Sequence, residues 1–324
     1  MGVSKGALTV SIALLVALVL LVYAHLADTE RYAFILERAE PGWLLIAMVL
    51  QLFTYSCAGA IWGEVVHSGG HKLRISVLFR LAVEKLTVDQ LVPMIGMAGN
   101  LAVVRAMRRF GLPGWLAMEA IIIDILSRYA AYVVVVALTF AILWLHHDIT
   151  PLVRWLLTGF AVIAAIVPLA VLWFLRHRQW RPPGLLSRSR RISRFLDAAS
   201  SVSPGRIGSP ALITKAVLLQ MAIFFLDAGT LWSVLRAIGV SAPPVTAFVA
   251  LIMASIAATI SFLPGGIGSF EAACTATLAL LGIPLEAALT GTLLLRGLTL
   301  WLPLIPGFIL AHRDMTFVKQ KSHL

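Results

Sequence analysis

The sequence has little charge, little cysteine and few acidic residues. Charged residues make up 13% of its 324 residues and hydrophobic residues 60%, which excludes a soluble domain and indicates a polytopic all-α membrane protein. The two cysteines, Cys57 and Cys274, lie in apolar segments, so we expect no disulfide or metal framework. Acidic residues number 15 against 26 Lys and Arg. The basic residues lie in short loops between apolar segments, as in membrane proteins, so we expect no nucleic-acid partner despite a net charge of +11.

Residue patterns typical of catalysis are also missing. The sequence has no recognisable nucleophile–base pair, no metal-ligand cluster and no phosphate-binding loop of a soluble enzyme. The adjacent histidines His146 and His147 fit a loop between two apolar segments. We therefore expect no enzyme and no cofactor, although an integral-membrane transferase acting on lipid-linked substrates stays open as an alternative.

Six apolar segments are long enough to cross a membrane, which requires about 20 residues. They cover residues 7–24, 43–66, 115–145, 152–175, 211–235 and 285–311. We interpret residues 7–24 as a retained span and not a signal peptide. The segment is long for the apolar part of a signal peptide, and it lacks a clear cleavage site.

Two other apolar stretches are interrupted by proline and glycine. The break at 91–100 reads LVPMIGMAGN, and the break at 262–271 reads FLPGGIGSFE. Irregular backbone persists in lipid only where protein or a water-filled cavity covers it, so we predict two re-entrant hairpins. After the second break, Ser269 is the predicted N-cap and Glu271 lies in the first turn of a new helix. The N–H groups at such a helix start suit an anionic group.

The distribution of basic residues supports this topology. With six full spans and two re-entrant hairpins, both termini are cytoplasmic, and 18 Lys and Arg fall on inner segments against four on outer segments. Eight of the inner ones are arginines in the loop 176–210, which has one acid, Asp197. We expect this loop to be cytoplasmic and to attract anionic lipid headgroups.

The chain also contains an internal repeat within a single domain, residues 1–324. Pro93 lies 20 residues before Pro113, and Pro264 lies 20 residues before Pro284. Between them, Gly99-Asn100 matches Gly268-Ser269, in each case a glycine followed by a predicted N-cap residue. Repeat one covers about residues 41–146 and repeat two about 211–312. The predicted hairpins enter from opposite sides, which is the signature of a transporter built from inverted repeats with a binding site where the two tips meet.

Charged residues inside the apolar segments need partners or water, because each costs about 2.5–3.5 kcal/mol at the bilayer centre. Three pairs are spaced for contact on one helix: Arg80–Glu84, Lys85–Asp89 and Asp124–Arg128. Asp227, Glu271 and Arg296 have no local partner of opposite charge. We therefore expect Arg296 to pair with Glu271 or Asp227 across helices.

The residues PGGIGSFEAA, followed by a Gly-x-Pro and by LLLRGLTLWLPLIPG, resemble the lysylphosphatidylglycerol synthase transmembrane family, which includes the flippase half of the multiple-peptide-resistance proteins. The resemblance marks Pro264, Gly265, Gly266, Gly268, Phe270, Glu271 and Arg296. In the family's first motif an acidic residue precedes an arginine, whereas this chain has Asn100 before Arg105. We expect this chain to lack the aminoacyl-transferase domain of larger members, because 13 residues follow the last predicted span, and therefore not to synthesise lysyl-lipid alone.

Together these observations predict a lipid transporter of the flippase type in the cell membrane. Its substrate would be a charged-headgroup lipid: a phospholipid, an aminoacyl lipid, a polyprenyl phosphate or a hopanoid-type lipid. An ion-coupled transporter of small metabolites stays open, as do a homo-oligomer and a separate lipid-modifying enzyme as partners. The predicted substrate-binding residues are Pro93, Asn100, Arg128, Asp227, Pro264, Gly265, Gly266, Gly268, Ser269, Glu271 and Arg296.

Overall fold

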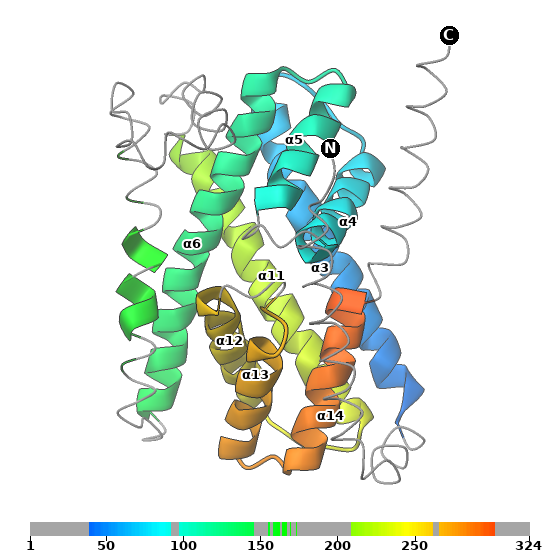
Figure 1. Ribbon diagram of the computed structural model, residues 1–324, viewed down its shortest axis with the longest axis vertical. Helices are drawn as coiled ribbons and strands as arrows, with labels where there is room; N and C mark the ends of the chain where they lie inside the picture. The colour runs from blue at the N-terminus through cyan, green and yellow to red at the C-terminus, as the bar shows by residue number, and fades with distance from the viewer. Residues whose placement is uncertain are drawn as a thin grey trace, which may run out of the picture.

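The computed structural model describes residues 39–91, 97–145, 155, 158–162, 164–166, 169, 173, 209–261 and 266–301. Within these residues all regular structure is helical (Figure 1). The predicted first span, the basic loop up to residue 208 and the end of the last predicted span lie outside them, as do Pro93, Pro264 and Gly265.

Three helices are long and apolar enough to cross a membrane: α3 (Pro41–Ser68), α6 (Gly114–Leu145) and α11 (Pro210–Ala237). They match three predicted spans to within two residues at either end. α3 and α11 each begin with proline in the first turn, where the missing N–H costs no helical hydrogen bond. The apolar helices confirm a membrane protein.

Two pairs of shorter helices form hairpins. α4 (Ile75–Leu91) is followed by α5 (Met97–Arg109), and α12 (Pro244–Ile260) by α13 (Ser269–Leu280). α14 (Leu285–Arg296) then passes into a π-helical turn, η3 (Gly297–Trp301). Each hairpin helix has at most 17 residues, fewer than the roughly 20 that a span needs. The two interruptions therefore fall where the sequence predicted them.

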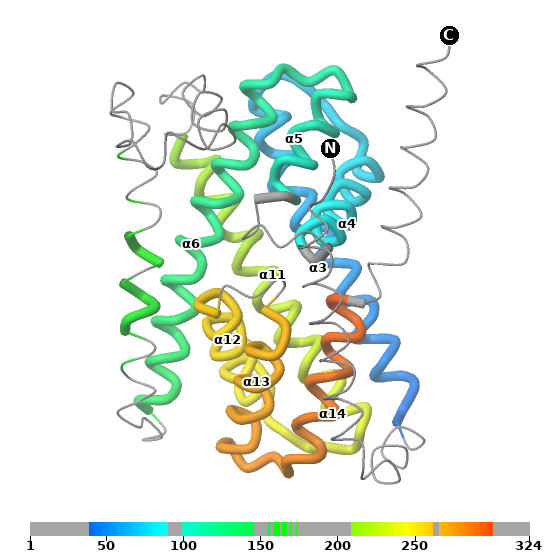
Figure 2. Tube along the Cα trace, in the orientation of Figure 1, coloured from blue at the N-terminus to red at the C-terminus, as the bar shows by residue number. Residues whose placement is uncertain are grey.

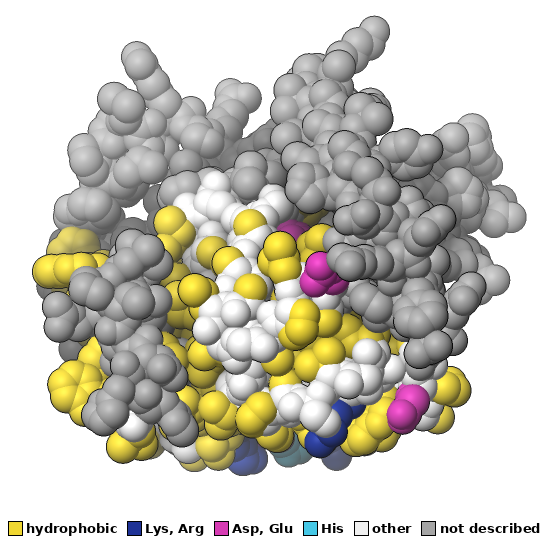
Figure 3. Space-filling model, turned by 90° about the horizontal axis from the view of Figure 1, so that it is seen from below, with side chains coloured by type: hydrophobic (Ala, Val, Ile, Leu, Met, Phe, Trp, Pro, Cys, Tyr) yellow, Lys and Arg dark blue, Asp and Glu magenta, His cyan; other side chains and the backbone are white. Residues whose placement is uncertain are grey.

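The hairpins lie at opposite ends of the molecule. α4 and α5 occupy the upper half of the view and α12 and α13 the lower half, and both hairpins turn their broken ends toward mid-height (Figures 1 and 2). α3 and α11 pack against each other between them. Seen from the end that carries the α13–α14 turn, the described surface is mostly hydrophobic or uncharged (Figure 3). The basic residues Arg105, Arg108 and Arg109 lie on α5, at the other end.

The helices before and after residue 200 have matching lengths. α3 and α11 both have 28 residues, and α4 and α12 both have 17. Their first residues are 169 positions apart in both cases (210 − 41 and 244 − 75). The turn after each long helix uses a glycine with positive φ, Gly70 at 77° and Gly239 at 82°.

Close packing explains one of the glycines in α3. A Cβ on Gly59 would lie 2.9 Å from the backbone carbon of Leu78, so α4 approaches α3 closer than any side chain permits. Around this contact a first apolar core of α3, α4, α5, α6 and the first turns of α11 includes Trp62, Leu81 and Ile121. A second core joins α6, α11, α12, α13 and α14.

Both N-cap predictions are wrong. α5 begins at Met97, so Asn100 lies inside the helix and does not cap it. α13 is capped by Gly268, and Ser269 is its first residue. The cap has φ 86°, a conformation that costs glycine nothing and is unfavourable for serine.

Candidate functional site

The tip of the second hairpin is held by its own polar groups. Gly268 donates its backbone N–H to Glu271 Oε2 over 2.6 Å. The Ser269 hydroxyl lies 2.8 Å from Ser261 Oγ and 3.0 Å from the carbonyl oxygen of Gly266, which links the end of α12 to the start of α13. The carboxylate of Glu271 thus already occupies one of the N–H donors that the sequence predicted for a ligand.

Arg296, which has no acidic residue near it on its own helix, forms an ion pair with a residue of another helix. Its Nε lies 2.5 Å from Glu271 Oε1, and its guanidinium carbon lies 4.5 Å from the centre of the Phe270 ring. The Arg296 and Glu271 side chains are 11% and 17% exposed, so the pair is largely shielded from solvent. Of the two predicted partners, Glu271 and Asp227, the structure selects Glu271. Arg296 is the last residue of α14 before the π-helical turn, a deviation that is frequent at functional sites.

The tip of the first hairpin uses a carboxylate in a different way. Asp89, near the end of α4, accepts the backbone N–H of Gly99 over 2.9 Å. A Cβ on Gly99 would lie 2.5 Å from this carboxylate, so the close approach requires glycine. Both hairpins therefore place a carboxylate on the first turn of their second helix, Asp89 from the preceding helix and Glu271 from the same helix.

Asp89 belongs to a cluster of charges between α4 and α6. Lys85 Nζ lies 3.4 Å from Asp89 Oδ2 and 4.0 Å from Asp124 Oδ2. Arg128 Nη2 lies 3.5 Å from Asp124 Oδ1. The Asp124 side chain is 4% exposed and that of Arg128 43%, so the arginine extends from a buried acid toward open space. Each of the three ion pairs predicted between residues four positions apart on the same helix is formed. The third, Arg80–Glu84 on α4, has a distance of 2.7 Å between Nε and Oε1.

Asp227 lies in the contact between α3 and α11. Its Oδ1 accepts hydrogen bonds from Gln51 Nε2 at 3.0 Å and from Thr54 Oγ1 at 3.1 Å. Gln51 also lies 3.0 Å from Thr230 Oγ1. Asp227 forms no ion pair with a described residue, but it interacts electrostatically with Arg128, as does Asp89. Arg128 is thus coupled to carboxylates on both α4 and α11.

Two glutamines that the sequence analysis missed complete these contacts. Gln51 binds Asp227, and Gln220 Nε2 donates to Asp124 Oδ1 over 2.8 Å. Gln51 and Gln220 occur at matching places in α3 and α11, because they are separated by the same 169 residues as the starts of those helices (220 − 51). Their spacing was the signal in the sequence that could have identified them: two glutamines lie in predicted apolar spans and are separated by the same distance as the two repeats.

The remaining predicted residues divide between buried and undescribed positions. Asn100 Oδ1 is buried in α5 without a hydrogen-bond partner. Gly266 has φ 63° and packs against Ala258, where an added Cβ would lie 2.4 Å from the Ala258 Cβ. In the part of the chain that the structure describes, no group of three His, Cys, Asp or Glu could hold a metal ion.

A comparison with protein families gives one match over most of the chain. The model described as the lysylphosphatidylglycerol synthase TM region matches residues 9–307. The chain belongs to this family. The match confirms the resemblance carried by the glycine-rich tip and Arg296, and it covers both hairpins. A lysylphosphatidylglycerol synthase TM region is a lipid-related membrane domain, which is consistent with lipid transport. A sequence comparison with curated proteins finds no match.

Proposed function

We propose that this protein moves a charged-headgroup lipid between the leaflets of the cell membrane. The observation that carries the proposal is the pair of opposed hairpins, each with a carboxylate on the first turn of its second helix and a cation beside it. Unpaired charges are costly at membrane depth, so charges retained there are typical of a substrate pathway.

The arrangement further supports two inverted repeats, with the hairpins re-entering the membrane from opposite sides. α3 and α11 have equal lengths and run in opposite directions (Figure 1). α5 and α13 are followed by turns at Gly111 and Gly282, with φ 82° and 89°. Repeats of this kind place the binding site near the bilayer midplane, and rocking of one repeat against the other alternates access to it.

The charged residues supply groups for both ends of a zwitterionic or anionic headgroup. Arg128 is the more open cation, with 43% of its side chain exposed, and would bind phosphate. Arg296 would exchange Glu271 for phosphate once a headgroup reaches the tip. Glu271 or Asp227 would then hold an amine or a proton.

The test is lipid transport by purified protein in liposomes, read as loss of headgroup accessibility on one leaflet over time. Glu271→Gln keeps an oxygen that can accept the Gly268 N–H but removes the charge that pairs with Arg296. We expect this variant to fold and to lose at least about tenfold in transport rate, equivalent to about 1.4 kcal/mol. Glu286→Gln, in the first turn of α14, is the matched control and should transport normally.

Transport by Glu271→Gln at the wild-type rate would remove the ion pair from the mechanism. Absence of transport by the wild-type protein for every charged lipid tested would contradict the proposed function itself.

A further inference from the structure

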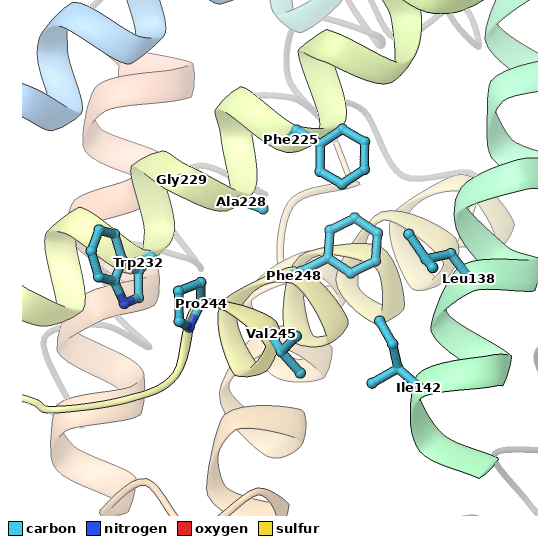
Figure 4. A pocket seen from close by; sticks show the side chains of 9 residues that line it. All are labelled: Leu138, Ile142, Phe225, Ala228, Gly229, Trp232, Pro244, Val245 and Phe248. Carbon is cyan, nitrogen blue, oxygen red and sulfur yellow. The ribbon is translucent and has the colours of Figure 1, made fainter. Parts of the chain in front are cut away.

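An apolar groove on α11 is lined by none of the charged residues of the proposed site. It has a volume of about 280 Å³ and is formed by α11, α6 and α12 (Figure 4). Phe225 of α11 and Phe248 of α12 stack with ring centres 5.3 Å apart, Leu138 of α6 lies beside Phe248, and Val245 lies on α12 near its start (Figure 4). These side chains are open to the surroundings, since Leu138 is 39%, Val245 43% and Phe225 46% exposed. The groove therefore opens sideways from the helices.

The groove has the shape of a slot. Phe225, Ala228 and Trp232 lie on one face of α11, because they are spaced by three and four residues. From the first to the last the helix rises about 10 Å. The small side chain of Ala228 leaves space between the larger side chains of Phe225 and Trp232, as Figure 4 shows. The volume is at the lower limit of the roughly 300–1,000 Å³ of ligand pockets, and the lining side chains are apolar, so the groove fits a single hydrocarbon chain.

A cation lies at one end of the slot. Arg236 follows Trp232 by one helical turn, and its guanidinium carbon lies 5.5 Å from the centre of the Trp232 ring. One terminal nitrogen, Nη1, donates to Ser241 Oγ over 2.9 Å, whereas Nε is buried without a hydrogen-bond partner. Among the described residues no carboxylate forms an ion pair with Arg236. It is also in the last turn of α11, so its charge lies where that span leaves the apolar region.

We propose that this groove binds one acyl chain of an anionic phospholipid, with the lipid phosphate on Arg236. The acyl chain would be held by van der Waals packing against the apolar side chains, because lipid offers no hydrophobic driving force, and the guanidinium supplies charge-assisted hydrogen bonds to phosphate. The combination of a lipid-facing apolar slot and, at its interfacial end, a cation that pairs with no described carboxylate selects an anionic lipid over a neutral one. This site does not depend on the proposed transport, because a lipid bound here contacts none of the residues assigned to the tips.

The experiment uses the protein in phosphatidylcholine vesicles with a trace of photoactivatable lipid whose diazirine is on the acyl chain. Peptides are mapped by mass spectrometry after illumination, once with a phosphatidylglycerol probe and once with a phosphatidylcholine probe. We expect adducts concentrated in residues 225–248 and 138–142. The phosphatidylglycerol probe should label about fivefold more, the ratio that one favourable cation near the membrane surface provides.

Two variants separate the chain from the headgroup. Leu138→Trp fills the slot and should remove most labelling at residues 225–248. The same substitution at Leu52, which is 52% exposed on α3, is the control and should change nothing. Arg236→Gln should retain labelling of the groove but remove the preference for the anionic probe.

Labelling spread evenly over the exposed apolar residues and insensitive to Leu138→Trp would overturn the proposed chain site. Equal labelling by both probes in the wild-type protein would overturn the assignment of an anionic lipid. Intact groove labelling in a Glu271→Gln variant that no longer transports would leave this proposal standing and separate it from the transport mechanism.

Discussion

The bare backbone at the start of α13 can be tested with two glycines of positive φ, one on either side of this helix. Gly268 has φ 86° and precedes α13, while Gly282 has φ 89° and follows it. A Cβ added at either position meets no atom within 4 Å. Gly268 combines φ 86° with ψ −48°, which lies outside the left-handed helical region at ψ of about +47°. An alanine there is strained by more than the roughly 1–2 kcal/mol that the left-handed helical region costs. Gly268→Ala should therefore be destabilised more than Gly282→Ala, and transport is compared per folded protein so that a difference reflects where the methyl group lies.

If a headgroup approaches the tip, the methyl group of Gly268→Ala occupies space that the headgroup needs. We expect both variants to lower the melting temperature of the detergent-purified protein, Gly268→Ala by the larger amount. In reconstituted liposomes Gly268→Ala should lose about tenfold or more in lipid transport, whereas Gly282→Ala should retain most of it. Equal transport by the two variants would refute the inference that a ligand contacts the tip backbone.

Two other predictions concern the tip packing and the direction of the hairpins. Gly266→Ala should be less stable than the Gly282→Ala control by a further 1–3 kcal/mol or so, because its Cβ would lie 2.4 Å from the Cβ of Ala258. In a melting experiment, adding Ala258→Gly to Gly266→Ala should recover part of the lost stability. Equal melting of Gly266→Ala and the control would contradict this packing. In a topology assay with an impermeant thiol reagent, Lys72→Cys and Phe110→Cys should be labelled from one side of the membrane and Pro284→Cys from the other. Opposite labelling of residues 72 and 110 would exclude a first hairpin that re-enters.

The ends of the helices could be predicted because they depend on local chemistry. Proline and glycine interrupt a helix wherever they occur, so the sequence predicted both breaks, and the structure has α12 ending at Ile260, just before Phe262. The caps were predicted wrongly. A serine after glycine was expected to cap α13, whereas Gly268 itself takes this position through its positive φ.

The partners of the buried charges were harder to predict because they depend on how helices pack. The sequence left Arg296 with two acids to choose from, and only the approach of α14 to α13 selects Glu271. The hydrogen bond from Gly99 to Asp89 joins residues on different helices and has no local signature. The pair Asp124–Arg128 was predicted correctly, because residues four positions apart on one helix are neighbours whatever the packing of the other helices.

The two matched glutamines allow a final prediction, because they support unequal carboxylates. Removing a hydrogen bond to a charged group costs about 1.5–3 kcal/mol. After Gln220→Leu, Asp124 still has Arg128 at 3.5 Å and Lys85 at 4.0 Å, and one such cation supplies an attraction of about 4 kcal/mol at an effective dielectric constant of 20. After Gln51→Leu, Asp227 keeps only the hydroxyl of Thr54 among its described hydrogen-bond donors.

Asp124 is almost fully buried, which raises the cost of losing any partner, but the two remaining cations offset that cost. We therefore expect Gln51→Leu to lower the melting temperature more than Gln220→Leu, by a difference equivalent to about 1–2 kcal/mol. Asp227→Asn should reduce this difference, because the neutral amide no longer needs a donor from Gln51. A larger loss of stability for Gln220→Leu than for Gln51→Leu would contradict this reasoning. It would mean that Asp227 does not depend on its neutral hydrogen-bond donors, and Asp227 would then no longer be assigned to the proposed substrate pathway.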